Sequence, residues 1–443
     1  MASSSPPSNS IKTIPTSDIA LACLFPLFVL FLIVKLAGPF SWTELRQLFS
    51  LRAITSSTTG LTKNEGPFSL KRAYYSYHQY RRMALTELSG MRRSYSGVGR
   101  KSKRIGHVIG YPEKLKRLEV ATDLNSVVTE QIAEVAISEF GLDVGELESG
   151  MSGMRPRVGD MGELGRVRES LKHFVRDWSE AGKVERVKIF TPILDALKQV
   201  VPLEEERKGK KVLVPGSGLG RLAWEISQLG FDTTANELSF FMNLAFRFLL
   251  SPNTTTITGQ HSIRPFAHWF SHQRSNVYTF RSIAFPDVVP RLGPTFRLIE
   301  DDFLALRPSA TDSSKNTTFW SNTDRQGEEG SYDFIVTLFF IDTSLDVLTT
   351  LEQIHTLLRP GGIWINLGPL LWTAGGQAKV ELSLEEVLQA AEETGFIISG
   401  RGGDDVDDVM KPRTVECEYT SDSEAMMRWT YKAEFWVAHR SKL

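Results

Sequence analysis

The chain has 443 residues, of which 41% are hydrophobic and 23% charged, a composition that fits a globular protein with a substantial core. Its formal net charge is −1 at pH 7, so we expect no nucleic acid among its partners. The two cysteines, Cys23 and Cys417, exclude a disulfide framework and a cysteine-based zinc site, and they favour a reducing compartment.

The N-terminal segment contains a polar stretch and then an apolar run. Residues 1–17 are rich in Ser, Pro and Thr and are predicted to be disordered. Residues 19–34 carry no charged side chain, and with their flanking residues they predict a membrane helix over 18–42. This helix would anchor the protein through residues 19–37 and leave its body in the cytosol. The alternative is a buried or interfacial helix in a protein that is soluble in the cytoplasm and nucleus.

A helical, basic region is predicted over residues 43–140. Between residues 71 and 117, Lys and Arg side chains are interspersed with tyrosines such as Tyr74, Tyr80 and Tyr95. Two interpretations are open. The region contacts anionic lipid headgroups or RNA, or it is the solvated face of a helical domain.

A glycine-rich stretch over residues 141–168 predicts a linker, and residues 169–443 predict a main domain of the α/β class. Two helices are expected between residues 170 and 199, because apolar residues recur there at helical spacing. His173 and Arg176 are three residues apart on the first of these helices and therefore share a face. The periodicity does not distinguish whether they face a ligand or solvent.

The most informative pattern in the chain is an apolar strand followed by a glycine turn. The strand over Val212–Val214 precedes glycines at alternate positions, Gly216, Gly218 and Gly220, and a helical apolar pattern follows. Glycines suit a turn in which the backbone takes a positive φ and lies close to a ligand. The next strand ends at Glu237, whose carboxylate is suited to accept hydrogen bonds from both hydroxyls of a ribose. The sequence therefore predicts a nucleoside-binding unit.

The arginine at position 221 restricts the kind of nucleoside. In a dinucleotide-binding fold this position is small, because helix and strand pack tightly there around a pyrophosphate. Arg221 therefore favours a cofactor without a pyrophosphate. The turn resembles the first motif of S-adenosylmethionine-dependent methyltransferases.

An aromatic insert over residues 251–293 contains a pair of histidines. His268 and His272 are four residues apart and would share one face of a helix, as metal ligands do. No third ligand lies at a suitable distance, so we predict a packing or polar role for the pair and no metal site.

Two later strand ends present further candidate site residues. The strand over residues 296–299 is followed by Asp302 and Phe303, which suit the exocyclic amine and the face of an adenine. The strand over residues 332–341 has no polar alternation, as is typical of a central parallel strand. It ends at Asp342, which would face the reacting group at the carboxyl edge of the sheet.

The C-terminal part of the chain predicts a capped helix and an edge strand. Ser383, followed three residues later by Glu386, predicts a capping box at the start of a helix over residues 382–395. Residues 428–437 alternate between polar and apolar side chains, which predicts the edge strand of a hairpin at the end of the sheet.

Six motifs in order along the chain resemble the carnosine N-methyltransferase family. They are VRDWSEAGKVER (175–186), VLVPGSGLGRLAWEISQLGF (212–231), NELSFFMN (236–243), FPDV (285–288), FFIDT (339–343) and RPGGIWINLGPLLW (359–372). The resemblance implies a Rossmann-like, seven-stranded methyltransferase sheet with helices on both faces, an N-terminal helical region and, in many members, a homodimer.

The resemblance also implies a reaction and a site. A methyl group passes from S-adenosyl-L-methionine to an imidazole nitrogen of carnosine, the β-alanyl-histidine dipeptide, and gives anserine. The implied cofactor contacts are His173, Arg176, Gly216, Gly218, Glu237, Asp302, Phe303 and Leu338. The implied substrate pocket consists of Asp342, Thr373 and Tyr431, with Asp342 as the catalytic residue.

Three positions depart from the family pattern. Thr373 stands where the family has a histidine, Trp429 where it has a tyrosine, and His173 where it has a glutamine. The changed substrate pocket leaves two alternatives open. In the first, the methyl acceptor is a different small molecule or a protein histidine. In the second, the chain is a non-catalytic, membrane-anchored scaffold that binds the cofactor.

Overall fold

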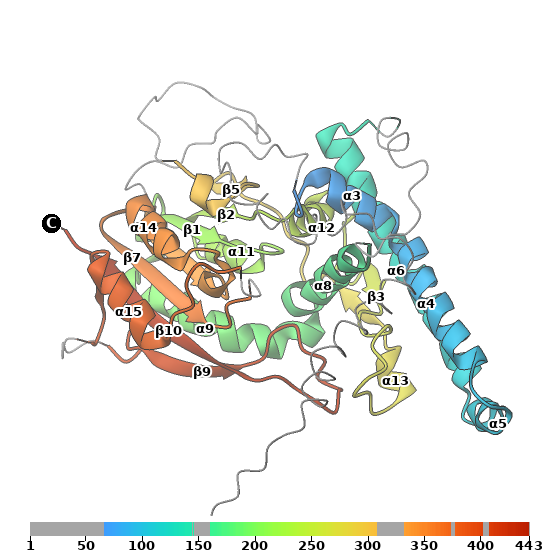
Figure 1. Cartoon of the computed structure of the whole chain (residues 1–443). Helices are drawn as coiled ribbons and strands as arrows, with labels where there is room; N and C mark the ends of the chain where they lie inside the picture. Colours follow the sequence, from blue (N-terminus) through green and yellow to red (C-terminus); the bar gives the residue numbers. More distant parts are fainter. Residues whose placement is uncertain are drawn as a thin grey trace, which may run out of the picture. The chain divides into compact units, whose positions relative to one another are not determined.

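The computed structural model describes residues 66–143, 145, 160–307, 332–373, 377–401 and 407–442 (Figure 1). The predicted disordered stretch over 1–17 and the predicted membrane helix over 18–42 lie outside these residues, so both stay predictions. Within the described part of the chain, no helix combines the length and the apolar character that crossing a membrane requires.

A mixed β-sheet forms the centre of the fold. Its strands lie in the order β5 (Phe296–Ile299), β2 (Asp232–Asn236), β1 (Lys211–Pro215), β6 (Tyr332–Leu338), β7 (Leu358–Gly368), β10 (Tyr431–Arg440) and β8 (Phe396–Ile398). The first five are parallel, and β10 runs antiparallel to both of its neighbours. This confirms the Rossmann-like α/β arrangement expected from the sequence, and the strand order reverses between β1 and β6.

The C-terminal edge of the sheet differs from the prediction. An eighth strand, β9 (Arg413–Cys417), pairs with the first half of β10, while β8 pairs with its last residues. The prediction of an edge strand over 428–437 is therefore wrong, because β10 lies inside the sheet. Its polar alternation covers only the first residues, and Phe435–Ala438 are buried because both faces of the sheet are covered there.

The strand register brings the predicted site residues to one edge of the sheet. Pro215 at the end of β1 is opposite Asn236 at the end of β2, so the glycine turn and Glu237 follow at the same edge. In the neighbouring pair, Leu338 of β6 is opposite Leu367 of β7. Ligands of open α/β sheets bind outside the carboxyl ends of the strands where the order reverses, and this is that edge.

Helices cover both faces of the sheet (Figure 1). They are α8 (Asp160–Trp178), α9 (Lys183–Val200), α10 (Glu204–Arg207), α11 (Arg221–Gln228), α12 (Phe240–Leu250), α14 (Val347–Leu357) and α15 (Leu384–Glu393). Val212 and Val214 of β1 belong to a buried hydrophobic cluster with α8, α9, α11 and α12. Leu213 belongs to a second cluster with α14 and α15, because alternate residues of a strand point to opposite faces.

In the described part of the chain, four further helices precede those that cover the sheet. They are α3 (Leu70–His78), α4 (Tyr80–Ser96), α5 (Arg100–Val108) and α6 (Tyr111–Phe140). Leu70 and Tyr77 belong to the same buried cluster as Val212 of β1, and the Tyr77 hydroxyl donates a hydrogen bond to the carbonyl of Phe241 at 2.6 Å. These helices and the sheet therefore share one hydrophobic core.

The stretch predicted as a linker over 141–168 is helical in its last part. Helix α8 begins at Asp160 and includes Gly162 and Gly165. Leu164 and Val167 between and beside these glycines are fully buried. The burial of an apolar helix face overrides the low helix propensity of glycine, which is why composition alone placed the boundary too late.

The aromatic insert forms a small unit beside α6 and α8. It contains β3 (His261–Ile263), α13 (Asn276–Thr279) and β4 (Ile283–Phe285), and the two strands pair in antiparallel fashion. His268 and His272 lie in turns, so they do not share a helical face. The described residues contain no group of three or more His, Cys, Asp and Glu side chains placed to hold a metal ion.

Candidate functional site

The glycine turn between β1 and α11 requires glycine at its two ends. Gly216 and Gly220 have φ values of +62° and +70°, in the left-handed region that other residues rarely adopt. A Cβ at Gly216 would lie 2.5 Å from the ring of Phe340, and a Cβ at Gly220 would lie 2.5 Å from the ring of Phe246. The turn therefore packs closely on both sides, which fixes the path of its backbone.

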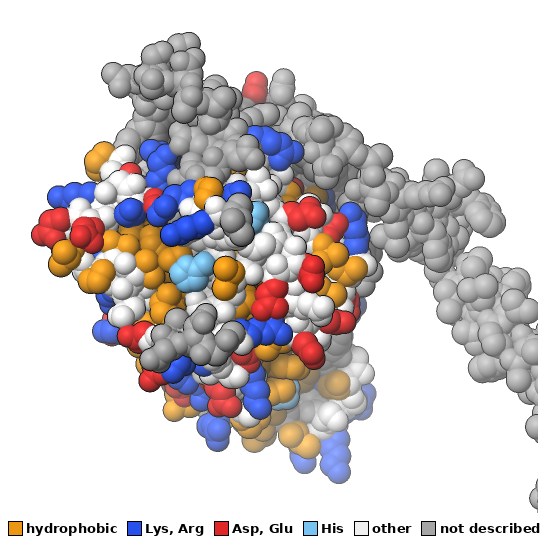
Figure 2. Space-filling view, turned by 90° about the vertical axis from the view of Figure 1, so that its left-hand side faces the viewer, with side chains coloured by type: hydrophobic (Ala, Val, Ile, Leu, Met, Phe, Trp, Pro, Cys, Tyr) orange, Lys and Arg blue, Asp and Glu red, His pale blue; other side chains and the backbone are white. Residues whose placement is uncertain are grey.

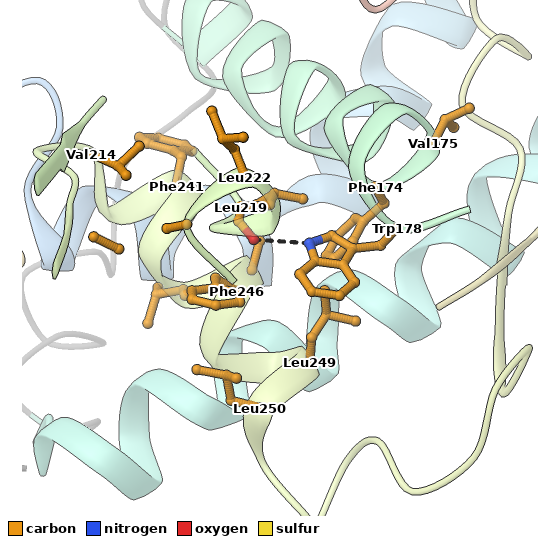
Figure 3. Close-up of a cluster of buried hydrophobic side chains, with 14 of the residues drawn as sticks. Phe174, Val175, Trp178, Val214, Leu219, Leu222, Phe241, Phe246, Leu249 and Leu250 are labelled. Atoms are coloured by element: carbon orange, nitrogen blue, oxygen red, sulfur yellow. Dashed lines mark hydrogen bonds between the residues drawn. The ribbon is translucent and has the colours of Figure 1, made fainter. Parts of the chain in front are cut away.

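A buried tryptophan connects this turn to helix α8. Trp178, the last residue of α8, donates a hydrogen bond from Nε1 to the carbonyl of Leu219 at 2.8 Å (Figure 3). Its ring stacks on Phe246 of α12, and all three side chains lie in the hydrophobic cluster of Figure 3. The end of α8 is thereby held across the glycine turn.

Glu237 is bound to the same turn from the end of β2. Its carboxylate accepts hydrogen bonds from the backbone N–H of Gly218 at 2.9 Å and of Ser239 at 2.8 Å. Burial raises the pKa of Glu237, and the backbone N–H groups counteract part of this effect. Each carboxylate oxygen can accept more than one hydrogen bond, so the group keeps acceptor capacity for a ligand.

Helix α8 places a charged group on the other side of Gly218. Arg176 donates from Nε and Nη2 to the two carboxylate oxygens of Asp177, at 2.6 and 2.9 Å. Burial alone would raise the pKa of Asp177, but the Arg176 guanidinium holds it well below its usual range. Burial and the neighbouring Arg176 lower the pKa of His173, so its imidazole is neutral.

Three buried polar atoms around the turn have no hydrogen-bond partner within the described residues. They are Nη1 of Arg176, Nδ1 of His173 and Oγ of Ser217. The nearest carboxylate oxygen, on Asp177, lies 3.5 Å from His173 Nδ1. A Cβ built on Gly218 would meet nothing closer than Arg176 and His173, both at 3.9 Å. Unpaired buried donors are costly, so their gathering beside open backbone indicates a polar ligand site.

The space beside these atoms is a small cavity covered by Tyr419. Its volume is about 30 Å³, and Arg176, Gly216, Leu338 and Tyr419 are among the lining residues. The Tyr419 ring lies 4.3 Å from the Arg176 guanidinium and stacks on Phe339 at 4.4 Å. The described chain also has a groove of about 810 Å³ between α14 and α15, which lies outside this site.

Sequence reasoning did not single out Tyr419. It lies in the loop between β9 and β10, where no periodicity marks it, and its partners are far away in the chain. Glu185 of α9 holds this loop, because its carboxylate accepts a hydrogen bond from the backbone N–H of Thr420 at 2.7 Å. The only sequence signal for this loop is Glu185, an acidic residue in the motif at 175–186 that binds the loop backbone.

Asp342 lies beyond the end of β6, in a short 3₁₀ helix, η4 (Ile341–Thr343). It is 3% exposed, and its Oδ2 accepts a hydrogen bond from the backbone N–H of Leu371 at 3.0 Å. Its other carboxylate oxygen accepts no hydrogen bond from another described residue. Burial raises the pKa of Asp342. Burial and the Asp342 charge both raise the pKa of Tyr431.

Aromatic rings connect the Asp342 side of the site to the glycine turn. Phe339 has a φ of +50°, an uncommon value for a residue with a Cβ, and follows directly after β6. Its ring meets Tyr431 edge-on at 5.6 Å and stacks on Tyr419. A row of contacting side chains therefore leads from the glycine turn toward Asp342. Its members are, in order, Arg176, Tyr419, Phe339 and Tyr431.

The remaining predicted residues have different surroundings. Asp302 caps a short 3₁₀ helix, η3 (Phe303–Ala305), by accepting from the Leu304 N–H at 2.9 Å. Phe303 is buried and packs edge-on against Phe340, which in turn covers Gly216. Thr373 is exposed and is joined to Asp342 through a backbone hydrogen bond. Trp429 is 71% exposed.

A second group that the sequence did not indicate fixes the end of α8. Asp287, from the FPDV motif, accepts hydrogen bonds from Arg221 at 2.7 Å and from Arg186 at 2.5 Å. Its backbone N–H donates to the carbonyl of Trp178 at 2.8 Å, and Arg186 donates to the carbonyl of Arg176 at 2.6 Å. Asp287 therefore positions the helix that carries Arg176, whose Nη1 has no hydrogen-bond partner within the described residues.

The sheet order, the glycine turn and the carboxylate at the tip of the adjoining strand are the features of the fold of class I methyltransferases, the class of enzymes that use S-adenosylmethionine. Comparison with known sequences then assigns the chain more narrowly. The chain belongs to the carnosine N-methyltransferase family, whose sequence profile matches residues 155–442.

Individual relatives are similar over different shares of the chain. The carnosine N-methyltransferase of Mus musculus is 33% identical over 285 residues, which are 63% of this chain and 64% of the mouse protein. That of Rattus norvegicus is 32% identical over 338 residues, 74% of this chain and 76% of the rat protein. That of Schizosaccharomyces pombe is 31% identical over 393 residues, 84% of this chain and 96% of the yeast protein. The chain thus spans less than two thirds of the mouse relative.

Proposed function

We propose that the protein transfers a methyl group from S-adenosylmethionine to an imidazole nitrogen of carnosine and so forms anserine. Membership of the family supports this acceptor. The structural observation that carries it is the buried carboxylate of Asp342, which follows β6 at the ligand edge of the sheet, the edge that also presents the rings of Phe339 and Tyr431. A buried carboxylate and aromatic rings at one edge suit an imidazole, which has both an N–H donor and a flat face.

The residues around the glycine turn fit the cofactor. S-adenosylmethionine supplies a methyl group on a positively charged sulfur. We assign its ribose hydroxyls to the carboxylate of Glu237, and its own carboxylate to the unpaired Nη1 of Arg176 with help from His173. Asp302 and Phe303 are the proposed contacts of the adenine. Leu338 lines the cavity beside the glycine turn.

The Tyr419 side chain has to move when the cofactor binds. Pockets for ligands of this size have volumes of roughly 300–1,000 Å³. The cavity at the turn is about 30 Å³, and Tyr419 covers it by lying against the guanidinium of Arg176. We propose that displacement of this ring from the Arg176 guanidinium opens the cofactor site.

Asp342 sets the reactive form of the imidazole in this proposal. Methyl transfer is an in-line displacement, so only an imidazole nitrogen with a free lone pair can attack. An ionised Asp342 accepts a hydrogen bond from the other nitrogen's N–H and so fixes the tautomer. The new N–C bond leaves the ring positively charged, which the carboxylate stabilises before a proton returns to solvent.

One experiment tests the acceptor. The purified full chain is incubated with S-adenosylmethionine labelled in its methyl group and with carnosine, histidine or a histidine-containing protein extract. We expect the label in anserine, identified by mass spectrometry. If the label appears in histidine or in protein and not in the dipeptide, the protein is a methyltransferase with an acceptor other than carnosine. Tight cofactor binding with no labelled product would favour the scaffold alternative.

A second acceptor class is favoured by one observation. Thr373 is exposed, and it stands where the family pattern has a histidine, so this position offers a small hydroxyl side chain in place of an imidazole. Such a site suits a larger histidine-containing acceptor. If this is correct, a Thr373→His variant gains activity toward carnosine relative to the unchanged chain, while its affinity for the cofactor stays the same.

We also propose that residues 18–42 anchor the protein in a membrane with its catalytic part in the cytosol, and that the protein forms a homodimer. The anchor rests on the apolar run over 19–34. Resistance to extraction at alkaline pH tests the anchor, with a chain that lacks residues 1–42 as the comparison. Light scattering of the detergent-solubilised protein tests the dimer.

A further inference from the structure

Helix α5 and the ends of its two neighbours form a strongly basic tip. Figure 1 shows α5 at the end of α4 that points away from the sheet. Residues 91–117 contain nine Lys and Arg side chains and one carboxylate, Glu113. The basic residues are Arg92, Arg93, Arg100, Lys101, Lys103, Arg104, Lys114, Lys116 and Arg117.

Most of these charges have no ion-pair partner among the residues that the structure describes. Arg92 pairs with Glu119, and Lys114 and Arg117 lie over aromatic rings of the insert. The four basic residues of α5 itself, Arg100, Lys101, Lys103 and Arg104, form no ion pair with another described side chain. The face of the molecule in Figure 2 is different, because positive and negative side chains are interspersed there.

The same helix exposes three branched apolar side chains. Ile105, Val108 and Ile109 are 51%, 83% and 69% exposed. They are three and four residues apart and therefore share one face. On the other side of the helix, Gly106 is buried, and a Cβ there would lie 2.2 Å from the hydroxyl oxygen of Tyr95. Close packing on Tyr95 holds α5 on α4 and leaves the apolar face in solvent.

We propose that the tip of α5 is a docking surface for a bilayer that contains anionic lipids. The basic side chains contact the phosphate and carboxylate groups of the headgroups, and Ile105, Val108 and Ile109 enter the boundary with the acyl chains. An amphipathic helix with a basic flank and branched apolar residues on one face is the form of such surfaces. The proposal concerns a surface apart from the methyl-transfer site and does not depend on the acceptor.

The structure favours lipid over RNA as the partner. Single-stranded RNA is bound by exposed aromatic rings on which bases stack, beside basic side chains. Three tyrosines of the basic region, Tyr74, Tyr77 and Tyr80, serve the core instead and are at most 3% exposed. Tyr95 packs against Tyr111 and Gly106. What the tip presents is charge and aliphatic surface.

Vesicle binding by the full chain tests the proposal. The protein is sedimented with phosphatidylcholine vesicles that contain either no phosphatidylserine or about 30% phosphatidylserine, a content of roughly the order found in an anionic leaflet. The anchor over residues 18–42 would bind both kinds, so the measured quantity is the gain in binding that phosphatidylserine gives. Each basic residue near such a surface is worth roughly fivefold in binding.

Two variants of the tip and one matched control define the outcome. A variant with Arg100→Gln, Lys101→Gln, Lys103→Gln and Arg104→Gln should lose at least tenfold of the phosphatidylserine-dependent gain. A variant with Ile105→Gln and Val108→Gln should lose several-fold. The control variant carries Val184→Gln and Val187→Gln, which remove a similarly exposed apolar pair beside lysines on α9. These side chains are 74% and 54% exposed. The control should leave the phosphatidylserine-dependent gain in binding unchanged.

A fluorescent probe at the tip reports insertion directly. In a Cys23→Ser background, in which Cys417 is buried, an environment-sensitive dye on Val108→Cys should shift to shorter wavelength with anionic vesicles. The same dye on Val184→Cys should not shift. Equal binding by the unchanged chain and both tip variants, with no dye shift, overturns the proposal. So does tight binding of a single-stranded RNA that depends on the four basic residues while vesicles produce no response.

Discussion

The guanidinium of Arg176 lies 4.3 Å from the centre of the Tyr419 ring, although one residue belongs to α8 and the other to the loop before β10. A cation over an aromatic ring is stabilised by roughly 0.5–2 kcal/mol. The same guanidinium is the group that we assign to the carboxylate of the cofactor. The ring and the cofactor therefore compete for one position.

This competition predicts the effect of removing the ring. The Tyr419→Ala variant should bind S-adenosylhomocysteine more tightly, with a Kd lower by roughly threefold or more, because no cation–π contact has to be broken. Calorimetric titration measures the Kd. Tyr278→Ala, which removes a partly exposed tyrosine from α13, is the control and should leave the Kd unchanged. A raised Kd in Tyr419→Ala would mean that the ring supports the bound cofactor instead of competing with it.

Removal of the Glu237 carboxylate should weaken cofactor binding. Glu237→Ala deletes the acceptor that we assign to two ribose hydroxyls, and hydrogen bonds to a charged group are worth roughly 1.5–3 kcal/mol each. The expected rise in the Kd for S-adenosylhomocysteine is at least tenfold. Glu237→Gln keeps one oxygen acceptor and should show a smaller rise.

Thermal unfolding separates this effect from damage to the turn, since Glu237 also accepts the N–H groups of Gly218 and Ser239. A Glu237→Gln variant with unchanged melting temperature and unchanged Kd would remove Glu237 from the cofactor site. Glu393→Gln, at an exposed position of α15, is the control for the loss of one carboxylate.

Local patterns in the sequence predicted the elements that local forces determine. The apolar run before Gly216 became β1, and the capping box of Ser383 and Glu386 is present at the start of α15. The polar alternation near residue 431 suggested an edge strand, but position in a sheet depends on which strands pair, and β8 and β9 cover that edge. Long-range pairing leaves no trace in the periodicity of one segment.

The same distinction applies to the site. Residues that follow a strand end, such as Glu237 and Asp342, could be placed because the topology of an open sheet fixes that edge. Tyr419 could not, because it reaches Arg176 through a loop that Glu185 holds from another helix. The role of Asp287 depends on three helices that meet only in the folded chain.

Substitution of the buried acid should impair the chemical step. Asp342→Asn keeps the shape of the side chain but removes the charge that fixes and stabilises the imidazole. The expected loss in kcat/KM for carnosine is on the order of 10² or more, with an unchanged Kd for the cofactor. Unchanged turnover would exclude Asp342 from the mechanism.

The pH profile gives a second test of the same residue. Activity requires an ionised Asp342, whose pKa burial raises above 3.8, and a neutral substrate imidazole, whose ordinary pKa is about 6.5. In the unchanged enzyme, log kcat/KM should therefore rise with a slope near two at the acid end, where both groups are protonated. In Asp342→Asn only the imidazole titrates, so the slope should be near one. Equal slopes would contradict the assignment.

Asp342 should also lower the stability of the protein at neutral pH. A carboxyl whose pKa is raised in the folded state favours folding at low pH, and this contribution is lost as the pH rises through the folded pKa. Asp342→Asn removes the cost of burying the charge. The difference in melting temperature, that of Asp342→Asn minus that of the unchanged protein, should therefore be larger at pH 8 than at pH 4. A difference that is the same at both pH values would show that folding does not change the pKa of the Asp342 carboxyl.

The network around Asp287 should contribute to both stability and cofactor binding. Asp287→Asn leaves Arg186 and Arg221, which are 4% and 8% exposed, close together without their shared counter-ion. Loss of one partner from such a buried group costs about 3 kcal/mol in the free energy of unfolding, which urea titration measures. The Kd for S-adenosylhomocysteine should rise as well, because Arg186, which donates to the carbonyl of Arg176 at the end of α8, loses the counter-ion that orients it. The exposed pair of Asp195 and Lys198 provides the control, since Asp195→Asn should change neither quantity. A destabilised Asp287→Asn protein with normal cofactor affinity would restrict the network to a structural role and separate it from the site.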